Sequence, residues 1–286
     1  SAPLFHAAAG TPVGLIVGVI ATITLLMAGA IGMAARDIKR VLAYSTISQL
    51  GYMMLGLAAG GAAASIFHLA THAFFKALLF LGAGSVIYAL HHEQNIWKMG
   101  GLLKTMPVTG WTFLIGTLAL CGIFPLSGFW SKDEILVLAA SHSLLLYWVG
   151  TLTAGLTAFY MGRVLWIAFL GEGKHSSAHP VHESPFVMTG PLIFLAVLSL
   201  IGGFLGIPYF LHAAEHAKLN LSVAIFSTFV AIAGLWGSYL VYGKRPSHDP
   251  LEKKLGPVYL LLKNKYFFDS LYRWYVDQVQ QRVAGF

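Results

Sequence analysis

Apolar residues fill most of this chain in long stretches, which short polar segments separate. Seven of the stretches reach the roughly 20 apolar residues that an α-helix needs to cross a membrane. Strands of a β-barrel would instead alternate in runs of about 10 residues, and the richness in Leu, Ala, Gly and Met is typical of membrane helices. The pattern predicts an all-α membrane protein with about seven transmembrane helices, over residues 11–35, 41–60, 62–90, 107–140, 146–170, 186–208 and 221–243.

Composition supports this class and excludes others. Of the 286 residues, 57% are hydrophobic and 10% are charged, whereas a soluble domain carries about 25% charged residues. The net charge of +7 would suggest nucleic acid in a soluble chain, but here we interpret it as loop charge that orients membrane spans. The single cysteine, Cys121, cannot form an intramolecular disulfide, and no Cys/His grouping suggests zinc or an iron–sulfur cluster. We expect neither nucleic-acid binding nor a cofactor.

Positive residues are unevenly distributed between the two ends of the predicted helices. Of the 18 Lys and Arg residues, 15 fall on the side that holds the first, third and fifth connections and the C-terminus, Arg163 among them. The other side has Lys218 alone, and Lys76 and Lys132 fall inside spans. Because positive loops stay in the cytoplasm, the N-terminus is predicted to be periplasmic and the C-terminus cytoplasmic.

The final segment, residues 244–286, is basic and aromatic and is not a further span. Over 266–277 its apolar and aromatic residues recur at helical spacing, as in an amphipathic helix at the headgroup boundary. An ordinary cytoplasmic helix packed on a partner subunit would give the same pattern. We therefore predict an amphipathic helical segment without choosing between these two surroundings.

The third predicted helix carries His68, His72 and Lys76 at positions i, i+4 and i+8, which places them on one face. A charge inside the bilayer costs roughly 2.5–3.5 kcal/mol on insertion scales, so an intramembrane lysine is a functional candidate. Histidine titrates near neutral pH, and the three side chains together have the chemistry of a proton wire. A metal site would need a carboxylate or thiolate that this helix lacks, and histidines that only bond to neighbouring helices are the structural alternative.

The second predicted helix is apolar except for a group of hydroxyl and amide side chains. Such residues usually form hydrogen bonds between membrane helices, and this is the interpretation that we favour. They could also hold water beside the histidines of the third helix. The group consists of Tyr44, Ser45, Ser48, Gln49 and Tyr52.

The fourth apolar segment, residues 107–140, is too long for one straight span. Its 34 residues would extend about 51 Å as a helix, well beyond the roughly 30 Å hydrocarbon core. Gly122, Pro125, Ser127 and Gly128 predict a break within it. An interrupted membrane helix is tolerated where the freed backbone faces protein or a cavity, and transporters place ion sites at such positions.

The sequence after this break predicts how the helix restarts. Ser131 and Glu134 have the spacing of a capping box, with Ser131 as the N-cap. Lys132 would then occupy the first helical position, where burial and the positive end of the helix dipole oppose its charged form. Asp133 points about 100° away from Lys132 and should contact a different neighbour. A loop lysine near the membrane surface is the alternative for Lys132.

Two histidine-rich segments are predicted to carry no chemistry. The tract at 174–183 has metal-binding residue types, but Pro180 and its serines leave little fixed geometry, so we interpret it as a solvated loop. His91, His92 and Glu93 follow the third helix, where histidines suit a helix C-terminus. No metal site is expected in either segment.

Three stretches closely resemble the antiporter-like membrane subunits of respiratory complex I, the proton-pumping NADH-quinone oxidoreductase. They read DIKRVLAYSTISQLGY at 37–52, FHLATHAFFKALLFL at 67–81 and GFWSKDE at 128–134. The stretch NKYFFDSLY at 264–272 resembles the stretch before the lateral helix in the distal, subunit L (subunit 5) type. The resemblance covers the C-terminal half of such a subunit, and the first repeat of the family is absent.

The resemblance implies a domain organisation and a set of site residues. Residues 1–170 would form the second of two inverted five-helix repeats, each a half-channel with a broken helix. Residues 171–243 would add two transmembrane helices, and 244–286 would form the cytoplasmic or interfacial tail. Family roles fall on Lys76 as the central relay, His68 and His72 as bridging histidines, Lys132 on the broken helix, and Asp133 near the exit.

The resemblance also implies a function. The chain would translocate protons as a subunit of NADH:quinone oxidoreductase in a bacterial inner membrane, with redox catalysis, flavin, iron–sulfur clusters and quinone on partner subunits. Its partners would be other complex I membrane subunits, especially the neighbouring antiporter-like subunit, and the lipid bilayer. A Mrp-type cation/proton antiporter subunit or a membrane-bound hydrogenase subunit shares the same motifs. A purely structural membrane anchor, with lysines that never titrate, is the alternative of another class.

Overall fold

The computed structural model describes residues 11–173, 181–207, 220–244 and 246–284, which are almost entirely helical and contain no β-strand. Six helices or helix pairs are long and apolar enough to cross a membrane, and a shorter apolar helix, α6, accompanies them. The predicted all-α membrane architecture is therefore confirmed. The membrane helices are α2 (Pro12–Ala34), α3 (Ile38–Ala58), α4 (Ala62–Ala89), α6 (Pro107–Cys121), α7 (Ser127–His142), α8 (Leu144–Val164), α9 (Phe186–Ile201) and α11 (Leu221–Tyr242).

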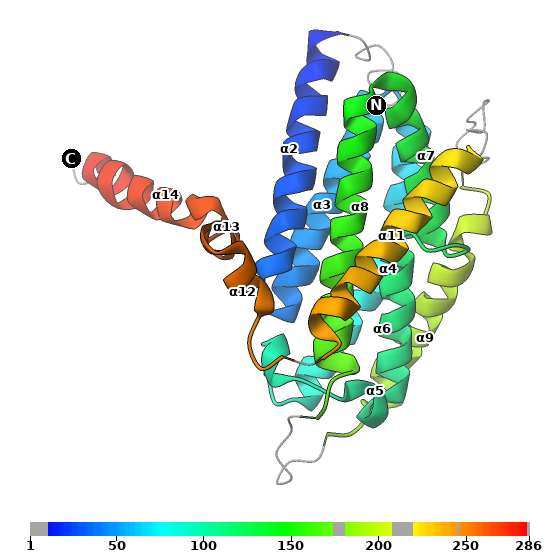
Figure 1. Ribbon diagram of the computed structural model, residues 1–286, viewed down its shortest axis with the longest axis vertical. Helices are drawn as coiled ribbons and strands as arrows, with labels where there is room; N and C mark the ends of the chain where they lie inside the picture. Colours follow the sequence, from blue (N-terminus) through cyan, green and yellow to red (C-terminus); the bar gives the residue numbers. More distant parts are fainter. Residues whose placement is uncertain (1–10, 174–180, 208–219, 245, 285–286) are drawn as a thin grey trace.

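These helices stand side by side in one bundle, with α2 on one edge and α9 on the other (Figure 1). The pair α6 and α7 is the broken fourth span, and its two halves are separated by residues 122–126. Short helical turns cap or extend the bundle: η1 (Ile96–Lys98), α5 (Leu102–Thr105), η2 (Leu165–Phe169), a π-helical turn that continues α8, and η3 (Gly202–Phe204).

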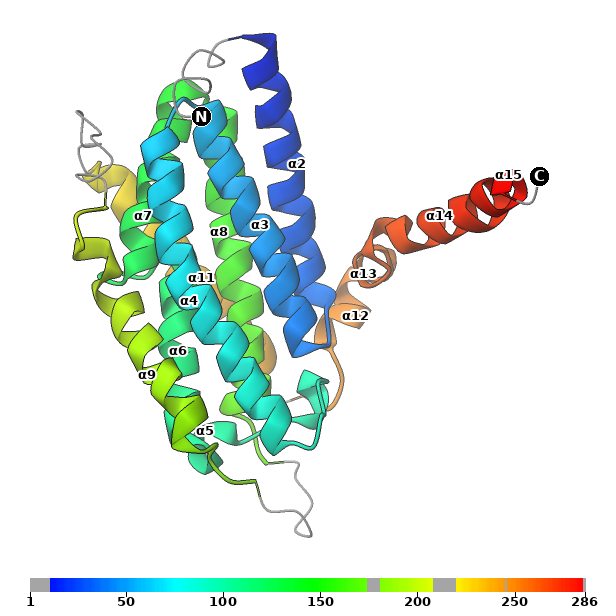
Figure 2. The same ribbon diagram turned by 180° about the vertical axis from the view of Figure 1, so that it is seen from behind.

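The C-terminal tail leaves the bundle beside the C-terminal end of α2 and projects away from it (Figures 1 and 2). Exposed aromatic residues follow much of the projecting part, including Tyr272 and Trp274. A helical segment is present as α14 and η5, but it begins at Phe268, because Tyr266 and Phe267 have left-handed φ values of +55° and +60°. The bilayer or a partner as its surroundings stays a prediction. The tail comprises α12 (Pro250–Leu255), α13 (Pro257–Lys263), η4 (Lys265–Phe267), α14 (Phe268–Tyr275), η5 (Val276–Gln280) and α15 (Gln281–Ala284).

Small residues allow the helices to approach closely. At Gly51 an added Cβ would lie 2.9 Å from the backbone of Leu25, so α3 rests directly on α2. Ser48 donates a hydrogen bond to the Leu25 carbonyl, 3.0 Å away, and the Tyr52 hydroxyl donates to the Gly150 carbonyl of α8. These two side chains of α3 therefore bond between helices, as the sequence predicted.

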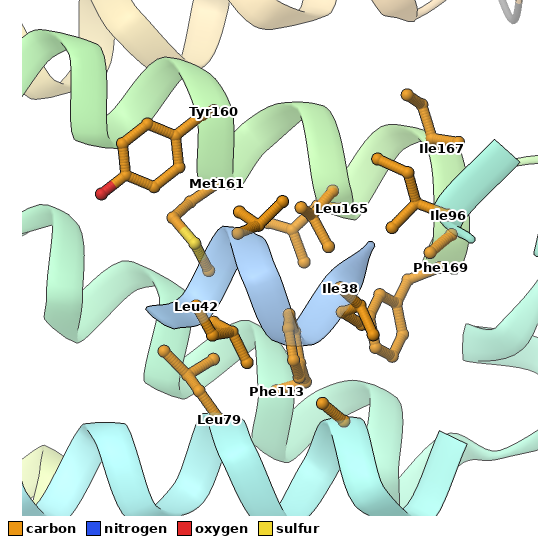
Figure 3. Packing of buried hydrophobic residues seen from close by; sticks show 14 of the residues in the cluster. Ile38, Leu42, Leu79, Ile96, Phe113, Tyr160, Met161, Leu165, Ile167 and Phe169 are labelled. Carbon is orange, nitrogen blue, oxygen red and sulfur yellow. The ribbon is translucent and has the colours of Figure 1, made fainter. Parts of the chain in front are cut away.

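The main apolar cluster fills the end of the bundle that carries the α4–η1 loop (Figure 3). Leu42 of α3 lies next to Leu79 of α4 there, Ile38 lies beside Phe169, and the rings of Phe113 and Phe169 stack with centroids 4.5 Å apart. A second cluster around Tyr52 and Leu136 fills the opposite end. The polar side chains of α4 lie between these two apolar clusters.

Candidate proton-relay site

The polar stripe of α4 is buried inside the bundle. His68, His72 and Lys76 are all buried, although α4 crosses a part of the protein packed with apolar side chains. The rings of His68 and His72 have centroids 6.1 Å apart, and the His72 ring meets Phe75 edge-on at 5.4 Å. The structure thus places the three residues on one inward face, as their spacing predicts.

His68 connects three helices through both of its ring nitrogens. Its Nε2 lies 3.1 Å from Oε1 of Gln49 on α3, and its Nδ1 lies 2.9 Å from Oγ of Ser131 on α7. The Gln49 carbonyl oxygen only accepts, so Nε2 donates to it. The Ser131 hydroxyl can donate to a neutral ring or accept from a protonated one. His68 can therefore change its protonation state without losing either hydrogen bond.

Ser131 is the hydroxyl that links α4 to the broken helix. Besides its bond to His68, its Oγ lies 2.7 Å from Oγ1 of Thr71 and 3.3 Å from the Ser127 carbonyl. The sequence predicted that Ser131 caps the N-terminus of a helix, and this is wrong. Ser131 lies inside α7, which begins at Ser127.

Close packing at the break explains the earlier helix start. Gly122 takes the left-handed conformation with φ of +79° and ends α6, so the predicted break at Gly122 and Pro125 is confirmed. Gly128 approaches α6 so closely that a Cβ there would lie 1.9 Å from the Ala119 carbonyl oxygen. Because Gly128 has no side chain, α7 can begin against this carbonyl, and Ser127 and Gly128 belong to the second helix rather than to the break.

Lys132 consequently occupies the second turn of α7 rather than its first position. Its Nζ donates to the Leu120 carbonyl in the last turn of α6, 2.8 Å away, and it lies 5.3 Å from the ring centroid of Tyr52. The sequence predicted that a helix dipole would oppose the charged form of Lys132. The structure shows the opposite, since the lysine contacts the negative, C-terminal end of α6, which favours the charged form. A carbonyl and an aromatic face stabilise the ammonium in place of a carboxylate.

Lys76 is held in the same manner. Its Nζ donates to the Leu42 carbonyl of α3 at 3.2 Å, and Nε2 of His72, one turn away, has no hydrogen-bond partner among the described residues. Within the described part of the chain, neither Lys76 nor Lys132 forms an ion pair with a carboxylate. Each buried ammonium thus donates a hydrogen bond to one backbone carbonyl, and Lys132 also faces the Tyr52 ring.

Asp133 points toward a different helix from its neighbour Lys132, as the 100° rotation predicts. Its Oδ1 accepts a 2.6 Å hydrogen bond from Ser227 of α11, and its Oδ2 has no partner among the described residues. The side chain is buried. Ser227 was not identified from the sequence, because a single serine in an apolar span gives no signal of its partner.

Sequence reasoning also missed a buried ion pair near the tail. We counted Arg163 as a loop charge, but its side chain is 0% exposed and pairs with Asp249 at 2.8 Å. Asp249 accepts further hydrogen bonds from the hydroxyls of Tyr242 and Tyr259, and Arg163 also donates to the Ala35 carbonyl. The sequence feature that could have indicated a fixed position for Asp249 is its place before Pro250, which is typical of a helix N-cap. In the structure Asp249 is this N-cap, and its side chain accepts a hydrogen bond from the Leu251 amide.

The histidine-rich tract at 174–183 lies largely outside the part of the chain that the structure describes. His175 and His179 lie outside the described residues, and His182 is exposed. Glu183 caps α6 by accepting hydrogen bonds from the amides of Val108 and Thr109. Among the described residues, no group of three or more His, Cys, Asp or Glu side chains could hold a metal ion.

Comparison with known proteins gives two family models that together cover most of the chain. Residues 2–157 match the model described as NADH:quinone oxidoreductase/Mrp antiporter, TM. Residues 160–279 match the model described as NADH dehydrogenase subunit 5 C-terminus. The second match includes α9, α11 and much of the tail, which lie outside the first.

Curated relatives carry matching names. The chloroplastic NAD(P)H-quinone oxidoreductase subunit 5 of Chaetosphaeridium globosum is 43% identical, over 92% of this chain and 45% of that protein. The NADH-quinone oxidoreductase subunit L of Neisseria meningitidis is 40% identical, over 90% of this chain and 45% of that protein. The chain therefore spans about half the length of the curated relatives it matches.

A solved structure supports the fold. A chain of the Mrp complex from Dietzia sp. superposes with a TM-score of 0.64 at 22% identity, over 77% of this chain and 49% of that chain. At this identity the likeness concerns the fold alone. The two family models and the curated relatives show that the chain belongs to the NADH:quinone oxidoreductase/Mrp antiporter membrane-subunit family, of the subunit 5/L type.

Proposed function

We propose that this chain translocates protons as a membrane subunit of a complex I-type NADH-quinone oxidoreductase, driven by quinone reduction in other subunits. His68, His72, Lys76, Lys132 and Asp133 would carry the protons. The family assignment supports this role, and so does the burial of all five side chains inside the bundle.

The observation that carries the proposal is the pair of buried lysines without carboxylate partners in the described chain. Each ammonium rests on one backbone carbonyl, Lys76 on Leu42 and Lys132 on Leu120. A full charge held so weakly inside a membrane is costly, and such residues mark ion pathways. A single carbonyl leaves the charge of each lysine sensitive to nearby charges, which is what a relay requires.

The hydrogen bonds suggest an order for the relay. Lys76 and His72 lie one turn apart on α4, His68 follows one turn later, and Ser131 joins His68 to the helix that carries Lys132 and Asp133. Ring centroids 6.1 Å apart are too distant for a direct hydrogen bond, so transfer between the histidines needs an intervening water or a side-chain movement. The Ser227-bound Asp133 is the proposed exit.

The apolar cluster in Figure 3 favours a lateral supply of protons to this site. Leu79 lies one turn beyond Lys76 on α4, toward the α4–η1 loop, and Phe113 packs against Gly82 a further turn along. Closely packed apolar side chains exclude water and offer no proton-transfer groups. We therefore propose that protons or charge reach Lys76 from the neighbouring antiporter-like subunit or from another part of the same assembly.

The wider assignments form part of the same proposal. The chain would lie in a bacterial inner membrane with its N-terminus periplasmic and its C-terminus cytoplasmic, among other complex I membrane subunits. Residues 1–170 would form the half-channel repeat, 171–243 the two further spans, and 244–286 the tail. The match of residues 160–279 to the subunit 5 C-terminal model favours this assembly over a Mrp-type antiporter.

Substitution of Lys132 tests the relay. Lys132→Met keeps the length and apolar volume of the side chain but removes the titrating group. Lys132→Arg keeps a charge that cannot be released, because a guanidinium stays protonated. In inverted membrane vesicles that contain the assembled complex, both variants should reduce NADH-driven proton pumping sharply while the complex still assembles.

Lys98→Met is the matched control, since the Lys98 side chain is 67% exposed and pairs with Glu93 in a loop; it should pump normally. Full pumping by Lys132→Arg together with loss in Lys132→Met would identify Lys132 as a fixed charge. Normal pumping by both Lys132 variants would support the purely structural role instead. Proton movement driven by an imposed sodium gradient without NADH would favour the Mrp-type alternative.

A further inference from the structure

A cavity of about 200 Å³ opens on the flank of the bundle, away from the buried histidines. It lies where the C-terminal end of α2, the start of α3 and the end of α13 meet, close to where the tail leaves the bundle (Figures 1 and 2). Apolar residues of the two bundle helices and α13 form part of its wall, and charged residues form the rest. The lining residues are Ile31, Ala34, Ala35, Arg36, Asp37, Arg40, Tyr44, Leu262, Lys263 and Lys265.

The charged part of the lining is strongly biased toward cations, with two arginines and two lysines against one carboxylate. That carboxylate, Asp37, accepts a 3.1 Å hydrogen bond from the Arg40 backbone amide and is engaged as the N-cap of α3. The start of α3 adds the positive end of its dipole to the same place. The cavity therefore attracts an anion.

The cations differ in how far the protein neutralises them. Arg36 and Lys263 share the carboxylate of Glu252, at 3.0 and 3.4 Å, and Lys265 pairs with Asp269. The Arg40 guanidinium makes no hydrogen bond or ion pair with any described residue, and it interacts with the Asp269 carboxylate only at longer range. One fork-shaped donor group thus remains available for an anion with several oxygens, such as a phosphate.

An apolar stripe on the exposed side of α3 continues from the cavity. Ile47, Leu50 and Met54 are each about two-fifths exposed, and with Arg40 they recur at helical spacing on one face. Tyr44 lies at the cavity itself, a residue type enriched at the membrane–water interface. A cationic cavity above an exposed apolar stripe matches a molecule with an anionic head and an apolar chain.

We propose that this cavity binds the phosphate headgroup of an anionic phospholipid, with Arg40 as its principal ligand and an acyl chain along Ile47, Leu50 and Met54. Basic pockets at the cytoplasmic side of membrane helices bind such headgroups. The bound phosphate would contact both the α2–α3 connection and the end of α13, and so would hold the first part of the tail against the bundle. The proposal is independent of the proton relay.

The test measures which lipids stay with the protein. The assembly that contains the chain is extracted from its native membrane in polymer nanodiscs, and the retained phospholipids are quantified by mass spectrometry. The double variant Arg40→Gln/Lys263→Gln should lose one tightly held anionic phospholipid, with a roughly tenfold weaker retention. Arg40→Lys, which keeps the charge but not the fork, should retain the lipid at an intermediate level.

Lys253→Gln/Lys254→Gln is the matched control, because it removes two exposed charges from α12 at the same end of the bundle without touching the cavity. It should keep the bound lipid. Equal lipid loss in both double variants, or no loss in either, would overturn the proposal. Displacement of the ligand by millimolar inorganic phosphate, without preference for a diacyl anion, would also overturn it and identify a free-phosphate site.

Discussion

Gly128 controls the geometry that holds Lys132 on the broken helix. A methyl group at this position would lie 1.9 Å from the Ala119 carbonyl oxygen, whereas non-bonded atoms settle at about 3.5 Å. Gly128→Ala must therefore push the start of α7 away from α6 by roughly 1.5 Å. Gly128 and Lys132 are one turn apart on the same face of α7, so the displacement acts directly on the 2.8 Å bond from Lys132 to the Leu120 carbonyl.

We expect Gly128→Ala to destabilise the subunit by about 1–3 kcal/mol, the usual cost of overpacking a close contact. It should also reduce proton pumping in vesicles, because the Lys132 ammonium loses its carbonyl partner. Gly84→Ala is the control, since an added Cβ at Gly84 meets nothing within 4 Å. It should leave both the melting temperature and pumping unchanged.

The reasoning is refuted if Gly128→Ala matches Gly84→Ala in both thermal unfolding and pumping. Such a result would mean that α7 can retreat without disturbing Lys132. A loss of stability with normal pumping would show that the carbonyl contact does not tune the lysine. Thermal unfolding therefore tests the close packing at Gly128, and pumping tests the role of the carbonyl contact of Lys132.

Three other predictions concern the ends of the bundle. Cysteines introduced at Lys98 and Ser141 should react with an impermeant thiol reagent from opposite faces of the membrane, and labelling of both from one face would refute the predicted orientation. Asp249→Asn leaves the buried Arg163 without its counter-ion, so it should lower the free energy of unfolding by about 3–5 kcal/mol and make proteolysis of the tail faster. Glu252→Gln is the comparison, because it breaks only half-exposed ion pairs and should lower the free energy of unfolding by less than about 1 kcal/mol. Hydrogen bonds from backbone amides and from Lys98 lower the pKa of Glu93. The stability that the Glu93 carboxylate gives to the folded loop is therefore fully present above the ordinary pKa of about 4.3, and it is lost as the pH falls through the lowered pKa of the folded state. The protection factors of the Gln94 and Asn95 amides, which donate to Glu93, should therefore fall only in acid when each rate is compared with the intrinsic exchange rate at the same pH. Unchanged protection factors would contradict this.

The hydrophobic pattern was sufficient to predict the positions of the membrane helices, because each apolar stretch is much longer than one helical turn. The predicted stretch 62–90 corresponds to α4, Ala62–Ala89, and the other spans agree to within a few residues. The polar stripe of α4 could be predicted for the same reason, since residues one turn apart share a face whatever surrounds them.

The start of α7 could not be predicted, because it depends on a contact across the break. Ser131 and Glu134 have the local signature of a capping box, yet the close approach of Gly128 to Ala119 lets the helix begin five residues earlier, at Ser127 instead of Lys132. Local hydrogen-bonding preference is worth only about 1 kcal/mol, so packing between helices can override it.

The sequence by itself determined the all-helical membrane class, the broken fourth span and the candidate ionisable side chains within the apolar segments of α4 and α7, since such residues are costly in a membrane helix. The tertiary structure alone decided what those side chains contact. It placed Lys132 on the Leu120 carbonyl, joined His68 to Ser131, and paired Arg163 with Asp249 across 86 residues of chain. These partners are distant in sequence, and periodicity along one helix carries no information about the helix that packs against it.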